Sequence, residues 1–346
     1  EKCNRDTVEN IHYEGEYNVT YTCDCKHSDT FDMRKKGIAK LQWRVDWPMR
    51  WDYEGVDFEP AGKDHFSAGG SRESGVELQD VVWKTKSPYG FMYDFIRVKG
   101  AGGKISSSSG GVITIHDVLD VYEPEMVRWL FAGTRPGTEF AISFDIDVIK
   151  LYEDWDRCER IYYGTEDAKN EKDHAQQKRI YELSSVDPKG IRKRQPFQPS
   201  FRHLTTIVQI YEHDIDGIVK HYADTYNLGD DDQERVRVRA RCASNWLKNY
   251  APDDMVFDVN TEPGAQVPAE LKPAFERLLV LLDSGRTEDD IGKDIYAFCK
   301  ENDIPVKTFF QAAYEILISK KRGPKLVPFI FTMGKDKAID LFKKAL

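Results

Sequence analysis

The sequence predicts an α/β region followed by an all-α region. Residues 36–115 mix short strand-like runs with loops that contain proline and glycine. From Asp117 onward, apolar residues recur three and four positions apart, which is typical of helices. A segment with few core residues, about 184–199, precedes a stretch in which nearly every run has helical periodicity, and such a change indicates a domain boundary. Four parts are therefore expected: 1–35, 36–115, 116–195 and 196–346.

The first part is short and polar, and it contains a cluster of candidate metal ligands. Residues 17–21 alternate between apolar and polar as a strand does. Cysteine, histidine and aspartate all bind zinc, and four such ligands complete a tetrahedral site. Because the spacing is irregular, a small knuckle held by apolar contacts alone is the alternative. The candidate ligands are Cys3, Asp6, Cys23, Cys25 and His27.

Three tryptophans, Trp43, Trp47 and Trp51, recur every four residues in the second part. A helix with an apolar stripe would explain this spacing without any ligand. Pro48, however, interrupts a helix and biases Trp47 toward extended geometry. We therefore expect an irregular segment that lines a pocket. In such a pocket an aromatic face attracts an ammonium group and a carboxylate, here Asp46, pairs with it.

The tetrapeptide Gly62-Lys63-Asp64-His65 follows a predicted strand at residues 56–59. Ligands of α/β sheets bind beyond the carboxyl ends of strands, so this turn is well placed for a nucleotide. A solvated turn in which Asp64 caps a helix is the structural alternative.

A lysine lies in a glycine-flanked, serine-rich loop, residues 102–110, directly after a predicted strand at residues 91–98. Glycines let such a loop change shape, and hydroxyls with an ammonium group can engage a polyphosphate. The loop is not a Walker A motif, because Val98 stands where that motif needs glycine and Ile105 where it needs serine or threonine. A flexible linker is the alternative.

The third and fourth parts are predicted to be largely helical. Pro124 fits the first turn of a helix that includes Met126 and Phe131, and a second helix fits residues 148–162. In the fourth part, six apolar aromatics are expected in the core: Trp246, Phe309, Phe310, Tyr314, Phe329 and Phe331. Predicted helices cover 203–226, 231–250, 268–283, 287–301, 305–320 and 335–345.

Charge is distributed unevenly along the chain. The net charge of −9 argues against a nucleic-acid partner, yet residues 319–346 hold 8 Lys/Arg against 2 Asp/Glu, and residues 189–250 hold 11 against 8. The C-terminal half can therefore offer a basic surface to RNA. Four alternating arginines (Arg235, Arg237, Arg239 and Arg241) would spread over two faces of a helix, where most such charges simply solvate a surface.

Composition excludes two classes of protein. Mean hydropathy is −0.60, and no apolar run approaches the roughly 18 residues that a membrane span needs. The six cysteines are scattered, which suits a reducing cytoplasm better than a disulfide framework.

Taken in order, residues 41–51, 56–65 and 102–110 resemble class I aminoacyl-tRNA synthetases, and most closely the class I lysyl-tRNA synthetases. The resemblance extends over essentially the whole chain and weakens toward the C-terminus. In that family the lysine loop is a variant of the KMSKS motif, which clamps the ATP phosphates during amino-acid activation. Lys104 matches the first lysine of the motif, and Ser107 stands where many class I enzymes have the second.

The resemblance implies a fold and a set of site residues. Residues 36–115 would be the second half of a Rossmann-type catalytic domain, 116–195 a connecting domain of the stem-contact type, and 196–346 a helical anticodon-binding domain. Lysine, ATP with Mg²⁺, and lysine tRNA are the expected partners, with structural Zn²⁺ as a candidate. The implied residues are Trp43, Asp46, Trp47, His65 and Tyr93 for lysine, with Trp43 favoured over Trp47; Gly62, Asp64, Lys104, Ser106, Ser107 and Ser108 for ATP; and Lys104, Ser106 and Ser107 for catalysis.

The resemblance also bears on the zinc ligands and on a missing motif. The family often has Cys-x-x-His followed later by Cys and His; here Asp6 takes the place of the first histidine and Cys25 is an extra thiolate. None of the eight histidines opens the His-x-Gly-His-type motif of class I enzymes. We therefore expect the first catalytic half to be absent from this chain, and the chain to be inactive alone.

Two other functions remain open. One is a non-catalytic tRNA-binding fragment. The other is a glutamyl-type class I synthetase, which would need arginines in the amino-acid pocket rather than Trp43, Asp46 and Tyr93.

Overall fold

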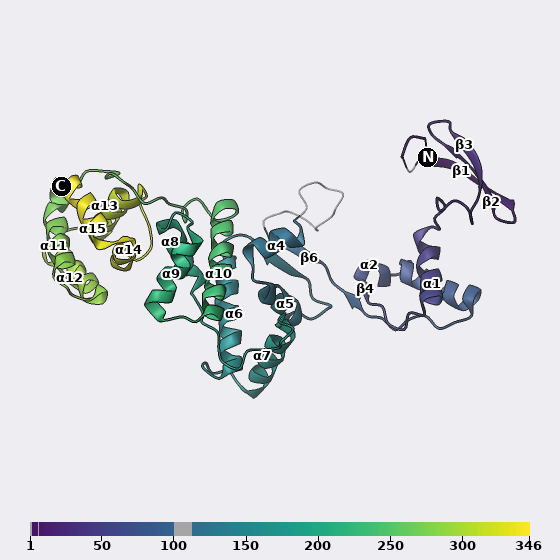
Figure 1. The fold of residues 1–346 in the computed structure, drawn as a ribbon, viewed down its shortest axis with the longest axis horizontal. Coiled ribbons are helices and arrows are strands. Elements are labelled where there is room, and N and C mark those ends of the chain that lie inside the picture. Colours follow the sequence, from purple (N-terminus) through teal and green to yellow (C-terminus); the bar gives the residue numbers. More distant parts are fainter. Residues whose placement is uncertain (1, 6, 100–112) are drawn as a thin grey trace. The chain divides into compact units, whose positions relative to one another are not determined.

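The structure is a computed structural model that describes residues 2–5, 7–99 and 113–346. The chain divides into two compact units, Glu1–Phe95 and Ile96–Leu346 (Figure 1). The lysine loop at 102–110 lies outside the described residues.

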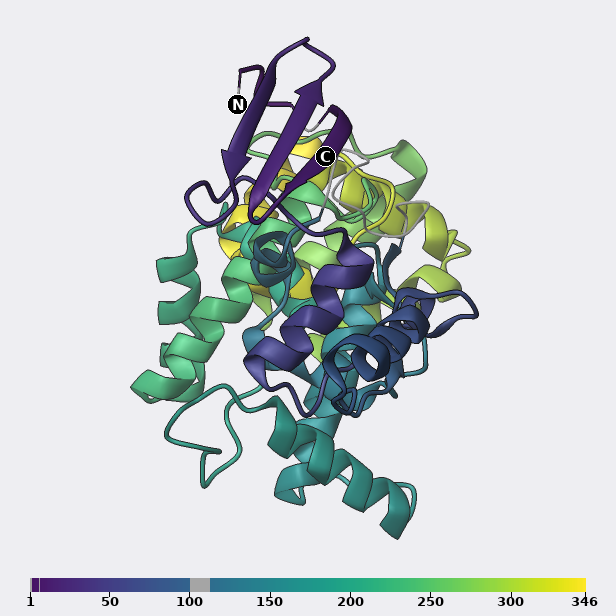
Figure 2. The ribbon, with the colours of Figure 1, turned by 90° about the vertical axis from the view of Figure 1, so that its right-hand side faces the viewer.

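The first unit begins with a three-stranded antiparallel sheet in the order β1-β2-β3 (Figure 2). Its strands are β1 (Val8–Gly15), β2 (Asn18–Cys23) and β3 (Ser28–Asp32). Alternate residues of β2, namely Val19, Tyr21 and Cys23, are buried and pack with Phe31. The alternation predicted near residues 17–21 is therefore confirmed.

The tryptophan segment is a helix, α1 (Trp43–Glu54), with Pro48 inside it. The expectation of an irregular segment is wrong. Proline in a helix interior costs about 3 kcal/mol, because it removes one hydrogen bond and crowds the preceding turn. Pro48 itself is buried, and Trp47 and Trp51 are 5% and 2% exposed. Burial of these large rings offsets the cost, and the helix ends at Gly55 with a φ of 64°.

The rest of the first unit has more helix than the sequence predicts. A two-residue parallel pair, β4 (Ala61–Gly62) with β5 (Met92–Tyr93), is extended by a single bridge between Phe58 and Tyr89. The strand predicted at 56–59 is thus shorter than expected. Three helical segments follow β4: α2 (Lys63–Phe66), α3 (Ser71–Leu78) and the π-helix η1 (Gln79–Trp83).

The second unit begins with another short parallel pair, β6 (Ile96–Lys99) and β7 (Phe140–Ser143). The strand predicted at 91–98 is therefore two strands, interrupted at Asp94 and Phe95. The helices in this part of the chain are α4 (Ile115–Val121), α5 (Pro124–Gly133), α6 (Asp147–Tyr163) and α7 (Glu171–Ser184), of which α7 packs against α5 and α6. Pro124 occupies the first turn of α5, as predicted, and α6 confirms the second predicted helix.

The remainder of the second unit is helical, as predicted, with differences in detail. The predicted helix 203–226 is two helices, separated by a turn in which Glu212 and His213 have positive φ. The sequence pattern did not predict α7 or α14. The elements are α8 (Phe201–Ile210), α9 (Ile215–Tyr226), α10 (Asp230–Asn249), η2 (Ala269–Leu271), α11 (Lys272–Asp283), α12 (Glu288–Glu301), α13 (Val306–Ile318), α14 (Leu326–Met333) and α15 (Lys335–Ala345).

Two apolar cores stabilise the second unit. The first core consists of buried residues between Val98 and Leu247, so it contains residues from before and after the 184–199 segment. The second core consists of buried residues between Phe257 and Ala345. The six C-terminal aromatics expected in the core are buried or packed against it, which confirms that prediction: Trp246, Phe309, Phe310, Tyr314, Phe329 and Phe331.

Arg235 and Arg239 lie inside the protein, so the expectation that most of the α10 arginines solvate a surface is wrong for this pair. Arg239 is fully buried; its Nε donates to Glu123 at 2.6 Å and its Nη1 to Asp156 at 2.9 Å. Nη1 of Arg239 also donates to the Pro199 carbonyl at 2.9 Å. Residues four apart share a helix face, which explains why the two guanidinium groups enter the same interior.

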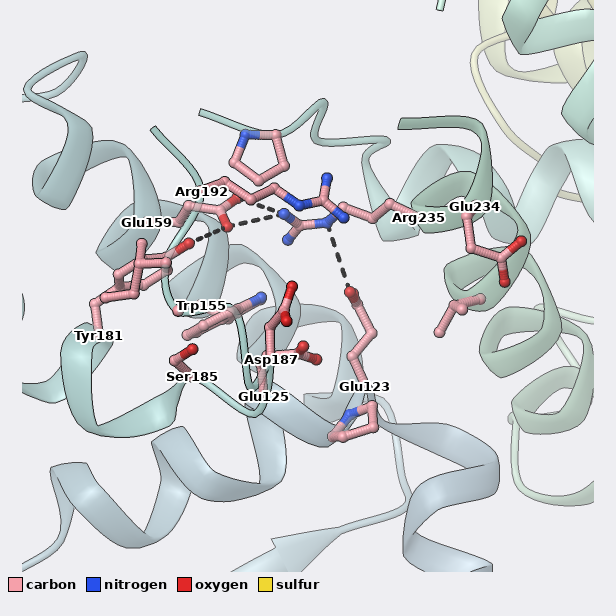
Figure 3. Close-up of a pocket in the computed structure, with 15 residues that line it drawn as sticks. Glu123, Glu125, Trp155, Glu159, Tyr181, Ser185, Asp187, Arg192, Glu234 and Arg235 are labelled. Carbon is pink, nitrogen blue, oxygen red and sulfur yellow. Dashed lines mark hydrogen bonds and ion pairs between the residues drawn. The ribbon is translucent and has the colours of Figure 1, made fainter. Parts of the chain in front are cut away.

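Arg235 donates to both oxygens of Glu159, at 2.8 and 2.9 Å (Figure 3). The same carboxylate accepts from Tyr181 Oη at 2.8 Å and from Gln198 Nε2 at 2.7 Å. Burial alone would raise the pKa of Glu159, but the charge and hydrogen bonds of Arg235 hold it below its ordinary value. Together, Glu123, Asp156, Glu159, Arg235 and Arg239 form what we call the buried ion network.

Removing one member of the buried ion network should destabilise the second unit strongly. Arg239→Ala leaves Glu123 and Asp156 buried without their partner, so we expect the free energy of unfolding to fall by about 3–5 kcal/mol. Arg241→Ala, at an exposed position two residues further on, should change it by less than about 0.5 kcal/mol. Chemical denaturation of both variants measures the difference. Equal stability of the two would contradict the role of the network.

Candidate functional site

The helix α1 carries a row of three tryptophan rings, in which Trp43 and Trp47 are stacked and Trp51 is tilted by 57° against Trp47. Ring centroids are 5.2 Å apart for Trp43 and Trp47 and 4.8 Å for Trp47 and Trp51. The indole N–H groups of Trp47 and Trp51 both donate to Oε2 of Glu59, the first at 3.0 Å. One carboxylate thus satisfies two buried donors and fixes the orientation of both rings.

The row of three rings is open at one end only. Trp47 is buried between its neighbours, whereas Trp43 is 49% exposed. His65 lies beside both rings, with its centroid 5.3 Å from Trp47 and 6.3 Å from Trp43, and its Nδ1 is 2.6 Å from Ser71 Oγ. Trp43 is therefore the ring of this row that a ligand can reach.

Asp46 is buried at 7% exposure and is paired within its own helix. Its Oδ2 accepts from Arg50 Nε at 3.0 Å, one helical turn away, and this bond raises the pKa of Arg50. Within the described part of the chain, no residue donates to the second oxygen, Oδ1.

Gly62 brings the turn and the neighbouring strand together. It pairs with Tyr93 in the β4–β5 ladder, and a Cβ placed on Gly62 would lie 3.6 Å from Asp64 Oδ1 and 3.9 Å from His65 Cδ2. The same Cβ would lie 4.0 Å from the Tyr93 ring, which is half exposed. Five of the residues predicted for lysine or ATP are thus grouped within the first unit: Trp43, Gly62, Asp64, His65 and Tyr93.

The turn is a short helix, α2, with Gly62 as its N-cap and Asp64 in its first turn. Lys63 pairs with Asp94 at 2.6 Å and lies over the Phe95 ring at 4.9 Å. The lysine thereby ties the turn to the end of β5. The predicted ATP and catalytic residues Lys104, Ser106, Ser107 and Ser108 lie outside the described residues.

Three thiols come together in the N-terminal sheet. The Sγ atoms of Cys3, Cys23 and Cys25 lie within 4.8 Å of one another, and those of Cys3 and Cys23 are 3.6 Å apart. Tetrahedral zinc with Zn–S bonds of about 2.3 Å places its sulfurs roughly 3.8 Å apart, so the donor set fits zinc. Hydrogen bonds from the Thr7 side chain and the Cys25 backbone lower the pKa of Cys23 to about 7, which favours the thiolate that metals bind.

The other two candidate zinc ligands, Asp6 and His27, are not part of this group of thiols as far as the structure describes them. In the part of the chain that the structure describes, His27 does not join the thiol group; its ring packs against Tyr21 with centroids 6.1 Å apart. Asp6 lies outside the described residues.

Glu59 is the residue that sequence reasoning missed. It was part of a predicted strand, and nothing in its neighbourhood indicated that two indoles would share its carboxylate. The only available signal was that three tryptophans on one helix face bring N–H donors that need a buried acceptor.

Comparisons with known proteins show which sequences this chain is similar to. The family model described as tRNA synthetases class I (K) matches residues 1–187. A protein named lysine–tRNA ligase from Borreliella burgdorferi is 47% identical over 341 residues, which is 97% of this chain and 64% of that protein. Proteins of the same name from Treponema pallidum and Thermococcus kodakarensis are each 40% identical, over 97% and 96% of this chain and 63% and 64% of their own lengths.

The chain spans less than two thirds of the length of these relatives. Among the described helices, none is both long and apolar enough to cross a membrane. From the match over more than half of its length, this chain belongs to the class I tRNA synthetase family that the model describes, tRNA synthetases class I (K).

Proposed function

We propose that the chain is part of a cytoplasmic class I lysine–tRNA ligase that activates lysine with ATP and transfers it to lysine tRNA. The observation that carries the proposal is the grouping of Trp43, Gly62, Asp64, His65 and Tyr93 within the first unit, where the Trp43 ring is exposed. Asp46 lies three residues after Trp43 on the same helix. An aromatic face and a carboxylate oxygen are the two features that recognise an alkyl ammonium.

The lysine side chain would lie against the exposed face of Trp43. Trp47 supports this ring from behind rather than touching the ligand, because its own faces are covered. The ammonium would approach Oδ1 of Asp46, while Tyr93 and His65 close the sides. This assignment favours lysine over glutamate, since an acidic side chain would meet a carboxylate here.

ATP would lie beside the α2 turn. Gly62 lets the backbone approach the adenosine, and Asp64 would accept hydrogen bonds from the ribose hydroxyls. The lysine carboxylate attacks the α-phosphate, which gives lysyl-adenylate and releases pyrophosphate; Mg²⁺ would accompany the ATP phosphates. The protein supplies positioning and charge stabilisation, through Lys104 and the hydroxyls of Ser106, Ser107 and Ser108.

The remaining parts would serve tRNA binding. We infer that residues 36–115 are the second half of a Rossmann-type domain, 116–195 a connecting domain of the stem-contact type, and 196–346 an anticodon-binding domain. The basic balance of residues 319–346 supports an RNA partner. A chain limited to residues 1–346 would bind tRNA without forming adenylate, which is the second candidate function.

Replacing the exposed tryptophan should weaken lysine binding. In a protein of the relatives' full length, Trp43→Ala should raise the KM for lysine about 3- to 30-fold, because a partly desolvated cation–π contact contributes about 0.5–2 kcal/mol. Tyr53→Ala, at an 84% exposed position on the same helix, is the matched control. Lysine-dependent ATP–pyrophosphate exchange measures both variants. An unchanged KM in the Trp43 variant would remove this face from the pocket.

Replacing the loop lysine should instead affect the chemical step. Lys104→Ala should slow ATP–pyrophosphate exchange roughly 100- to 1,000-fold with little change in lysine affinity, because the ammonium acts as charge develops on the phosphates. Lys86→Ala, an exposed lysine in the first unit, should leave exchange unchanged. Normal exchange in the Lys104 variant would show that the loop is only a linker.

Zinc should bind to the three thiols. Protein prepared under reducing conditions without chelator should contain about one zinc per chain, and Cys23→Ser should lose it because two thiols hold zinc weakly. Cys299→Ala, in the C-terminal helices, should retain the metal. Elemental analysis measures the zinc content of each protein. If the unmodified protein contains no zinc, the prediction is wrong, and apolar contacts alone hold the knuckle together.

A further inference from the structure

A cavity of about 470 Å³ lies in the second unit, between α8 and the segment 322–332. Pockets of about 300–1,000 Å³ typically hold one small ligand, so this cavity admits a single nucleotide rather than a duplex. Polar residues that line the cavity include Arg202, Thr206, Arg322, Lys325 and Thr332.

The buried side-chain amide of Gln209 connects lining residues of the cavity by hydrogen bonds. Its Nε2 donates to the Thr205 carbonyl at 2.7 Å and to the Met255 carbonyl at 3.3 Å, while its Oε1 accepts from Phe257 N at 2.6 Å. These bonds join α8, in one apolar core, to the chain that enters the other. The cavity therefore lies at a junction that is fixed by hydrogen bonds.

Tyr314 holds the segment with Gly323 and Pro324, which also lines the cavity. A Cβ on Gly323 would lie 2.8 Å from the Tyr314 ring, so only glycine fits at this approach without a shift. The Tyr314 hydroxyl donates to the Pro324 carbonyl, and burial raises the pKa of Tyr314 to about 12, which keeps this donor protonated. The backbone that carries Arg322 and Lys325 is thereby held in place.

The walls of the cavity are mainly positive. Arg202 is paired with Glu153 at 3.1 Å. Among the residues that the structure describes, Arg322 and Lys325 have no carboxylate partner, and Asp254 is the one acidic residue that lines the cavity. The helices α8 and α14 both begin at this cavity with no acidic residue in their first turns, so their dipoles also favour an anion.

We propose that this cavity binds one unstacked nucleotide of single-stranded RNA. Its phosphate lies between Arg322 and Lys325, and the hydroxyls of Thr206 and Thr332 face the sugar and base. The inference rests on the proposed tRNA-binding function and gives that function a location. RNA fits better than an acidic peptide, because basic residues continue along the chain on either side (Lys320, Lys321, Lys335 and Lys337) and single-stranded RNA is recognised through splayed nucleotides.

The test compares two double variants of the chain for binding to lysine tRNA. Arg322→Ala with Lys325→Ala should weaken binding about 10- to 100-fold, the value of losing charged hydrogen bonds, and should make the dependence of log affinity on log salt shallower by about 0.7–1. Lys293→Ala with Lys307→Ala removes the same charge from exposed positions on α12 and α13, and should bind like the unmodified chain.

The outcomes separate this site from the proposed function. If the unmodified chain binds lysine tRNA and both double variants bind it equally well, the cavity is not an RNA site, although the proposed function stands. If the unmodified chain binds no tRNA, the proposed function fails and this site with it. Short oligouridylate should compete with tRNA far better than free UMP does; equal competition by UMP would assign the cavity to free nucleotides and overturn the RNA site.

Discussion

The full burial of the Arg239 guanidinium is the constraint on which the second unit depends. A charge taken out of water must be paired and hydrogen-bonded, or the folded state loses several kcal/mol. Glu123 at the start of α5, Asp156 on α6 and the Pro199 carbonyl meet this requirement together. One side chain of α10 therefore fixes the relative positions of three segments from different parts of the chain. Arg235 extends the same requirement to Glu159 and, through it, to α7.

In the first unit, the buried polar groups that need a partner are neutral donors rather than charges. Two indole N–H groups need an acceptor inside the protein, and Glu59 provides it for both. Because Trp47 is fixed from behind in this way, Trp43 presents a rigid, half-exposed face. The Glu59 hydrogen bonds and the ring packing that stabilise α1 thus also form the aromatic wall of the proposed lysine pocket. This wall is in place without any closure of a loop.

Local patterns in the sequence predicted most helices and the strand alternation before Cys23, because these depend on neighbours close in the chain. Features that depend on distant partners were missed. Pro48 argued against a helix by local rules, yet ring burial outweighs its cost. The spacing of Arg235 and Arg239 places both on one face, but only the distant carboxylates show that this face is buried. Glu59 was missed for the same reason.

The proposed lysine pocket beside Trp43 should select lysine over other amino acids. The most direct measurement is ATP–pyrophosphate exchange by a protein of the relatives' full length, with lysine, arginine and glutamate offered separately. We expect exchange with lysine and none above background with glutamate, because an acidic side chain would meet the carboxylate of Asp46 in the proposed pocket. Exchange that depends on glutamate, or that proceeds equally with all three amino acids, would contradict it.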